Sequence, residues 1–168
     1  MTPRDEAAGP ADTAVSARQY FDDFVPGSVH EYGPTAPVSE AEIIDFARKY
    51  DPQPIHVDPD WARTGPFGGL IASGWHTAAL TMRLLVNSYV PAAASLASPG
   101  IDELRWVRPV RPGDVLRVRV TVVEARPSQS KPDRGLIRSR IEVLDSAGSV
   151  VMTLVALNLV RRRPTGPP

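Results

Sequence analysis

The distribution of proline is the feature that most constrains how this chain can fold. The 168 residues include 18 prolines, about twice the ordinary share of about 5%. Proline lacks a backbone donor and breaks helices and central strands, so regular structure should lie between prolines. Four long proline-free windows remain, at residues 38–51, 67–90, 113–126 and 133–163. We expect the helices and strands in these windows.

Composition then excludes several classes of protein. Hydrophobic residues make up 42% of the chain, which is enough for a folded core. Lys and Arg total 19 and Asp and Glu total 19, a balance that argues against a general binder of nucleic acid or of anionic membranes. The absence of cysteine excludes disulfides and Cys-ligated zinc. With no membrane-spanning run and no signal-peptide pattern, a cytoplasmic protein is expected.

Three regions are predicted along the chain. Residues 1–18 are rich in Ala, Pro, Asp and Thr and should form a disordered arm. Residues 19–163 should form one domain, followed by a frayed tail at 164–168. No internal repeat is visible.

Two helices are predicted. Ser39 followed by Glu42 is a capping-box pattern, and apolar residues at helical spacing extend the first helix over 39–50. A long helix should begin near Ser73 and run to Tyr89. Because it is apolar around most of its circumference, we expect it to be buried on most sides.

The second half of the chain shows the period-two pattern of strands. Valines at 118, 120 and 122 alternate with polar residues, and a similar alternation covers 137–143. Residues 150–160 are apolar on both faces, which predicts a central strand, and 101–108 should form another. A short first strand is plausible around Tyr32. The predicted fold class is α+β, with an antiparallel sheet covering one helix.

The segment Asp51-Pro52-Gln53-Pro54-Ile55-His56-Val57-Asp58 carries the strongest chemical signal. The two prolines fix the backbone between an acid and a histidine, an arrangement suited to general acid–base catalysis. The spacing is equally compatible with a helix-end acid and an ordinary loop histidine. A metal site at His56 and Asp58 is weaker, because no third ligand is evident nearby.

This segment and two later ones resemble the MaoC-like hydratase/dehydratase family, which includes R-specific enoyl-CoA hydratases. The first motif is Asp51-x-x-Pro54-Ile55-His56-x-Asp58, and the second is the run from Phe67 to Gly74. The third is the run Arg105-Trp106-Val107-Arg108-Pro109-Val110-Arg111-Pro112-Gly113-Asp114. The resemblance covers about residues 20–163, and the motifs occur in the family's order.

The resemblance implies a hot-dog fold, in which an antiparallel sheet wraps a long central helix, and a homodimer or higher oligomer. It implies that Asp51 and His56 add water reversibly to a trans-2-enoyl thioester, giving a (R)-3-hydroxyacyl thioester. The Gly74 amide would stabilise the thioester oxygen at a helix N-terminus. On the residues alone, Gly68, Gly69 and Gly74 could equally serve only a turn and a tight packing contact. The substrate would be an acyl-CoA or an acyl-carrier-protein thioester, with no metal and no cofactor required.

Further residues are predicted to contact the substrate. They are Gln53, Pro54, Ile55, Phe67, Gly68, Ser73 and Trp75. Arginine and lysine side chains could meet the phosphates of coenzyme A, because guanidinium groups match phosphate geometry. The candidates are Arg105, Arg108, Arg111, Lys131 and Arg134. His76 is expected to be structural and His30 to lie at the surface.

Two positions depart from the family pattern. Gln53 stands where an asparagine is usual, and Met82 stands where some relatives carry a serine that orients the catalytic aspartate. Asp51 must therefore be oriented by another group. These departures leave two alternatives open, a hot-dog thioesterase and a non-catalytic acyl-CoA binding module. The Pro54-Ile55-His56 signature argues against the first, and the intact Asp51 and His56 pair argues against the second.

Overall fold

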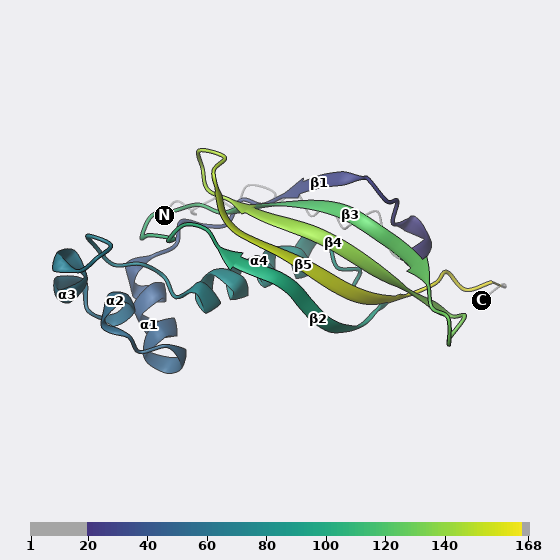
Figure 1. Ribbon diagram of the computed structural model, residues 1–168, viewed down its shortest axis with the longest axis horizontal. Helices are drawn as coiled ribbons and strands as arrows, with labels where there is room; N and C mark the ends of the chain where they lie inside the picture. Colours follow the sequence, from purple (N-terminus) through teal and green to yellow (C-terminus); the bar gives the residue numbers. More distant parts are fainter. Residues whose placement is uncertain (1–19, 166–168) are drawn as a thin grey trace, which may run out of the picture.

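The computed structural model describes residues 20–165, as a curved antiparallel sheet that lies over one long helix, with three shorter helices at one end (Figure 1). The predicted disordered arm at 1–18 falls outside the described residues, as do residues 166–168 of the predicted tail. The C-terminal end of the described chain lies at the opposite end of the sheet from helices α1, α2 and α3 (Figure 1).

The helices follow local capping signals. They are the 3-10 turn η1 (Phe21–Asp23) and helices α1 (Glu40–Tyr50), α2 (Pro54–Val57), α3 (Pro59–Thr64) and α4 (Gly74–Ser88). The Ser39 hydroxyl accepts a hydrogen bond from the Glu42 amide at 3.1 Å, which caps α1 as predicted. Ser73 caps α4 in the same way, through the Trp75 amide. The predicted starts of both helices are confirmed.

Five strands form one sheet in the order β1-β3-β4-β5-β2. They are β1 (Val29–Tyr32), β2 (Ser95–Trp106), β3 (Arg117–Pro127), β4 (Arg134–Leu144) and β5 (Val150–Arg161). All neighbouring pairs are antiparallel. The predicted short first strand is present, and the strand at 150–160 lies inside the sheet, as its two apolar faces predict.

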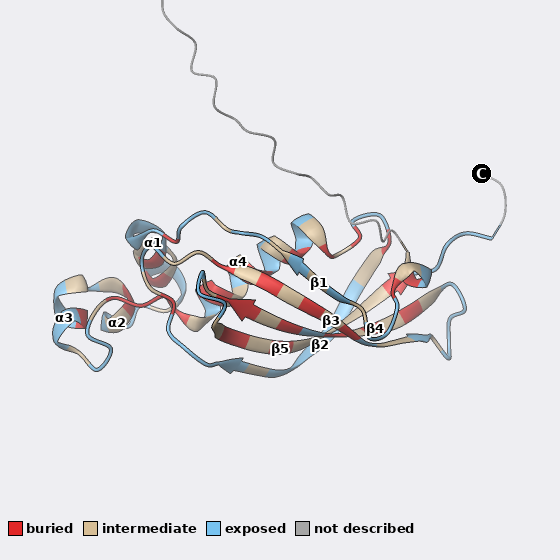
Figure 2. Cartoon of the chain, turned by 90° about the horizontal axis from the view of Figure 1, so that it is seen from above, coloured by how far each residue is buried: buried red, intermediate tan, exposed pale blue. Residues whose placement is uncertain are grey.

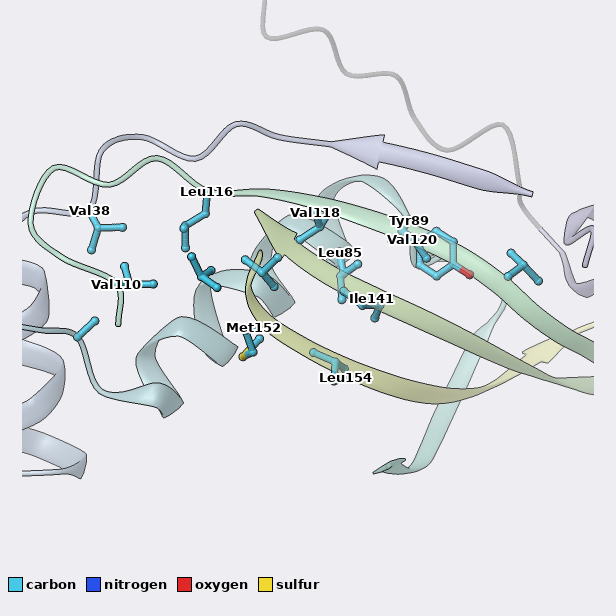
Figure 3. Packing of buried hydrophobic residues seen from close by; sticks show 14 of the residues in the cluster. Val38, Leu85, Tyr89, Val110, Leu116, Val118, Val120, Ile141, Met152 and Leu154 are labelled. Atoms are coloured by element: carbon cyan, nitrogen blue, oxygen red, sulfur yellow. The ribbon is translucent and has the colours of Figure 1, made fainter. Parts of the chain in front are cut away.

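The core lies between the concave face of the sheet and α4 (Figure 3). Val118 and Val120 of β3 are fully buried, and Val120 pairs with Ile141 of β4. Leu85 of α4 and Tyr89 at its C-terminal end pack against these side chains. The period-two pattern of the strands therefore places alternate residues against the helix.

The segment after α1 differs from the predicted loop. Residues 51–64 contain two short helices, and each begins at a proline in its first position, Pro54 in α2 and Pro59 in α3. Proline fits the first helical position because its missing N–H has no partner there and its φ angle is already helical. The prolines start helices here rather than interrupting structure.

Strand β2 is longer than the predicted strand at 101–108. It begins at Ser95 and ends at Trp106, so Pro99 lies inside it rather than between strands. The pairing with β5 shifts register between Ala97 and Gly100. Strand β2 is an edge strand, and an edge tolerates proline because one side of the strand needs no ladder hydrogen bonds.

Helix α4 is less buried than predicted. Its buried residues are His76, Thr77, Thr81 and Leu85, which form one face. Trp75, Met82 and Val86 are about half exposed, with side chains 59%, 49% and 51% accessible. Strand β2 is also exposed along the sheet edge (Figure 2). Within residues 20–165, every helix is too short or too polar to traverse a lipid bilayer.

Candidate active site

The acid and the histidine of the first motif meet in space. Asp51 ends α1 as its C-cap residue, and His56 lies in the single turn of α2. Their side chains approach with His56 Nε2 3.4 Å from Asp51 Oδ2. This separation is longer than a good direct hydrogen bond, so the two polar atoms can share a small ligand such as water.

The Asp51 carboxylate is held by two donors. The Ser73 hydroxyl donates to Oδ2 at 2.6 Å, and the Gln53 side-chain amide donates to Oδ1 at 2.7 Å. These two hydrogen bonds and the nearby His56 lower the pKa of Asp51, against the opposing effect of partial burial. Hydrogen bonds to the charged form favour it, so Asp51 is ionised at neutral pH.

The orientation of His56 fixes which of its nitrogens can act as a base. Its side chain is buried, and Nδ1 lies 2.8 Å from the backbone oxygen of Ile71. A carbonyl oxygen can only accept, so Nδ1 carries the proton. In the neutral ring, Nε2 then presents its lone pair toward Asp51 and can accept a proton there.

Gly74 opens α4 beside this pair. Its amide belongs to the first helical turn, where backbone N–H groups have no partner within the helix. A Cβ atom at this position would overlap the Trp106 ring. Glycine is required because the indole packs directly over the helix N-terminus, which leaves no room for a side chain.

These groups line one cavity of about 430 Å³. Six residues of the predicted site line it, namely Asp51, Gln53, His56, Phe67, Gly74 and Trp75. The other lining residues are Ile71, Ala72, Thr77, Trp106, Val107, Arg108, Pro109 and Val110. The last five come from the third sequence motif, in which only Arg108 is predicted from the sequence to contact the substrate. The walls are largely apolar and aromatic, and the polar groups gather at Asp51 and His56.

Four predicted substrate contacts, Pro54, Ile55, Gly68 and Ser73, do not line the cavity. Pro54 starts α2, and the Ile55 carbonyl accepts a hydrogen bond from the Ile71 amide at 3.3 Å. Gly68 is exposed in the turn before α4, with a φ angle of 64° that suits glycine. Ser73 is fully buried and uses its hydroxyl on Asp51.

The match to known proteins decides the family. The family model described as MaoC like domain matches residues 23–140, which is more than half of the chain. The chain belongs to the MaoC-like family. It is 34% identical over 126 residues to a 3-hydroxyacyl-thioester dehydratase Z of Mycobacterium tuberculosis, covering 74% of this chain and 82% of the mycobacterial protein.

Solved structures agree with the MaoC-like assignment. A MaoC-like dehydratase from Rhodospirillum rubrum superposes with a TM-score of 0.80 at 43% identity, covering 87% of this chain and 99% of the other. The R-hydratase PhaJ1 of Pseudomonas aeruginosa gives 0.69 at 26% identity, covering 89% and 94%. A double hot-dog protein of Mycobacterium tuberculosis, at 20% identity and a TM-score of 0.69, shares the fold. The predicted hot-dog fold is confirmed. Several relatives are named hydratases or dehydratases, which supports a hydro-lyase type of activity at the level of the family.

Of the five basic residues predicted to meet phosphates, two lie at or near the cavity. Arg108 lines it and keeps a mostly exposed guanidinium, 3.7 Å from Asp145. Arg111 instead donates to the backbone oxygen of Phe67 at 2.6 Å, which ties the wall of the cavity to the turn before α4.

The other three basic residues do not line the cavity in this chain. Arg105 is exposed on β2. Lys131 lies in the connection of β3 to β4 and Arg134 begins β4, at the end of the sheet away from α1 and α2 (Figure 1). Arg134 forms an ion pair with Asp133 at 2.8 Å. Phosphate contacts at these three residues therefore stay predictions.

The remaining histidines stay outside the site. His76 is buried and stacks on Phe46, with ring centroids 4.7 Å apart, and burial lowers its pKa. His30 lies half-buried on β1 rather than fully at the surface. Within residues 20–165, no group of three or more His, Cys, Asp or Glu side chains is arranged to hold a metal ion.

Replacing Pro54 by Ala should lower turnover more than stability. Proline at the first position of α2 sets the turn that carries His56, so alanine loosens the spacing between Asp51 and His56. We expect kcat to fall about fivefold to tenfold, because misplaced catalytic groups act poorly, while the melting temperature falls by only about 2–4 °C. Steady-state kinetics and thermal denaturation measure the two effects.

Pro59→Ala is the matched control, because Pro59 holds the same position in α3 but lies outside the cavity. It should show the thermal effect alone. A Pro54→Ala protein with a lower melting temperature and normal turnover would contradict the positioning role of Pro54.

Proposed function

We propose that this protein adds water reversibly to a trans-2-enoyl thioester and forms a (R)-3-hydroxyacyl thioester. The observation that carries the proposal is the convergence of Asp51, His56 and the Gly74 amide on one cavity with apolar walls. An acid–base pair beside an oxyanion donor is what hydration of a double bond next to a thioester carbonyl requires.

In the hydration direction, a water molecule lies between His56 Nε2 and the Asp51 carboxylate. Nε2 takes one water proton, while Asp51 accepts the other hydrogen as a hydrogen bond and stays ionised. The water oxygen bonds to C3 of the substrate, and the π electrons move onto the thioester oxygen, where the Gly74 N–H stabilises the charge. The enolate then collapses and its α-carbon takes the proton from Nε2, so that one water is added in all.

The surrounding cavity supports an acyl thioester as the substrate class. The indoles of Trp75 and Trp106 meet edge to face, with ring centroids 5.3 Å apart, and offer an apolar surface to an acyl chain. Arg108 adds a positive charge to the lining, where the phosphates of coenzyme A or of an acyl-carrier-protein arm could be bound. Each step uses only side chains and a backbone amide of the protein.

The test is a hydration assay on crotonyl-CoA and longer enoyl-CoAs, followed by loss of the enoyl absorbance and by chiral analysis of the product. Formation of the (R)-3-hydroxyacyl thioester supports the proposal. A parallel assay for free thiol separates it from thioester hydrolysis. Release of coenzyme A without any hydroxyacyl product would identify the protein as a thioesterase, and tight binding without turnover would identify a binding module.

The exposed edge strand β2 leads to a further part of the proposal, a homodimer. Strand β2 is twelve residues long and unpaired on its outer side, and Ile101 and Trp106 on it are exposed. Long edge strands are normally blunted or covered. A second copy can pair its own β2 antiparallel to this one, which joins the two sheets and covers both edges at once.

A lysine in the edge should break this association. We expect the parent protein to have twice the 18.2 kDa chain mass in solution, and Ile101→Lys to shift it to monomer, because a charge on an edge strand opposes pairing. Light scattering coupled to size exclusion measures the mass. Val123→Lys is the matched control, since Val123 is similarly exposed, at 52% against 56%, but lies on β3 inside the sheet. A dimer that persists in Ile101→Lys would contradict pairing through β2.

A further inference from the structure

Ser73 combines three features that no other residue of the site shares. It is fully buried, it caps α4 by accepting from the Trp75 amide at 3.3 Å, and it donates its hydroxyl to Asp51 at 2.6 Å. A hydroxyl donates one hydrogen bond and can accept others. The Ser73 side chain therefore links the Asp51 carboxylate to the N-terminus of α4.

We infer that Ser73 is the positioning residue of Asp51, and that it takes the place of the helix serine that the resemblance to some relatives implies at position 82. This inference rests on the proposed hydration, since it concerns the carboxylate that orients the water. Met82 cannot supply a hydrogen bond of this kind, and its side chain is half exposed. Ser73 reaches the same carboxylate from the start of the helix instead.

The geometry explains why this contact matters for the chemistry. Ser73 and Gln53 each bind one oxygen of the carboxylate, which fixes the rotation of the group and turns Oδ2 toward His56. Gln53 is exposed, whereas Ser73 is shielded from water. A shielded charge-assisted hydrogen bond is stronger and better defined than an exposed one. Ser73 is therefore the dominant of the two donors.

The capping contact adds a second constraint. The residue after Ser73 is Gly74, whose amide is the proposed oxyanion donor. Because one oxygen atom binds both Asp51 and the first turn of α4, the carboxylate and the oxyanion donor are held at a fixed separation. Ser73 does not line the cavity, so it acts on the reaction through Asp51 and Gly74 rather than on the substrate.

The test is the pH dependence of kcat and KM in Ser73→Ala and Ser73→Gly. Glycine is a nearly neutral replacement at a helix N-cap, so Ser73→Gly removes the hydroxyl with little loss of the cap. We expect kcat to fall about tenfold to a hundredfold, the range for loss of one hydrogen bond to a charged group, with KM little changed. The acid limb of the profile should move to higher pH, because Asp51 loses the donor that favours its ionised form.

Two serines provide matched controls. Ser39→Ala removes the same kind of cap from α1. Ser139→Ala removes a buried hydroxyl that is also in a 2.6 Å hydrogen bond, with Tyr89, away from the cavity. Both should lower the melting temperature and leave the pH profile unchanged. If the Ser73 variants behave like these controls, Ser73 is only structural and the inference is wrong.

A direct titration separates this inference from the proposed function. In free protein labelled with ¹³C at the aspartate carboxyl carbons, the Asp51 signal is identified by its loss in Asp51→Asn. Its midpoint should rise in Ser73→Ala and Ser73→Gly relative to the parent. This readout needs no substrate, so it supports or overturns the role of Ser73 even if no enoyl thioester is hydrated. An unchanged midpoint in both variants overturns it.

Discussion

Asp51→Asn should reduce kcat/KM for enoyl-CoA hydration by about a thousandfold, within the range of about 10²–10⁴ for a positioned acid–base group. Asparagine has nearly the same shape but no charge, and one of its two polar atoms becomes a donor. It can no longer accept hydrogen bonds from Ser73, Gln53 and a water together. Initial rates across a substrate series measure the loss, and near-UV circular dichroism checks the fold.

Asp58→Asn is the control for this prediction. Asp58 belongs to the same motif, but its carboxylate accepts only from the Asp60 and Trp61 amides at the start of α3. Asparagine caps a helix about as well as aspartate, so this variant should keep full activity. Normal hydration by Asp51→Asn would remove Asp51 from the mechanism.

His56→Ala is expected to have the other largest effect, a loss of about 10²- to 10⁴-fold in kcat. The change removes the nitrogen that, in the proposed mechanism, takes the water proton and later returns it to the α-carbon. It also leaves the Ile71 carbonyl without its buried donor, which should lower the melting temperature by a few degrees. Steady-state kinetics and thermal denaturation separate the two losses.

The control is His30→Ala, a half-buried histidine on β1 that does not line the cavity. This variant should lose some stability without any change in turnover per folded molecule. The assignment of His56 fails if His56→Ala retains the parent rate once both proteins are shown to be folded at the assay temperature.

Much of the fold could be read from the sequence, because it depends on short-range signals. The serine caps at 39 and 73 fixed where α1 and α4 begin, and both caps are present. The alternation of valines in β3 set which residues face the core, and Val118, Val120 and Val122 are fully buried. Capping and alternation involve residues that are close in sequence, so the helix starts and core-facing residues that they predict agree with the structure.

The errors arose where a residue's role depends on distant partners. The sequence predicts a rigid loop around Pro54, yet Pro54 begins α2 and Pro59 begins α3, because the first helical position needs no amide donor. Pro99 was placed between strands but lies within β2, where its position at the sheet edge makes it tolerable. The apolar circumference of α4 indicated burial, although part of its surface is exposed in the single chain.

The site was predicted in outline and not in its supporting contacts. The Asp51-to-His56 spacing and the Gly74 position could be taken from motifs that are continuous in sequence. The bond from Ser73 to Asp51 joins residues 22 positions apart, and the packing of Trp106 over Gly74 joins two motifs. No periodicity or spacing rule encodes such contacts, because they depend on how α4 and the end of β2 come together.

The proposed reacting groups, Asp51, His56 and Gly74, all come from one continuous stretch of chain that includes no strand of the sheet. The sheet side of the cavity contributes only the wall, from Trp106 to Val110. Under the proposed function, the bond-making groups all lie in this stretch, whereas the acyl-chain wall is shared between Trp75 beside it and Trp106 at the end of β2. Mutations around Trp106 would then change which acyl group fits without touching Asp51, His56 or Gly74, so new substrate ranges could evolve from the Trp106 side of the wall alone.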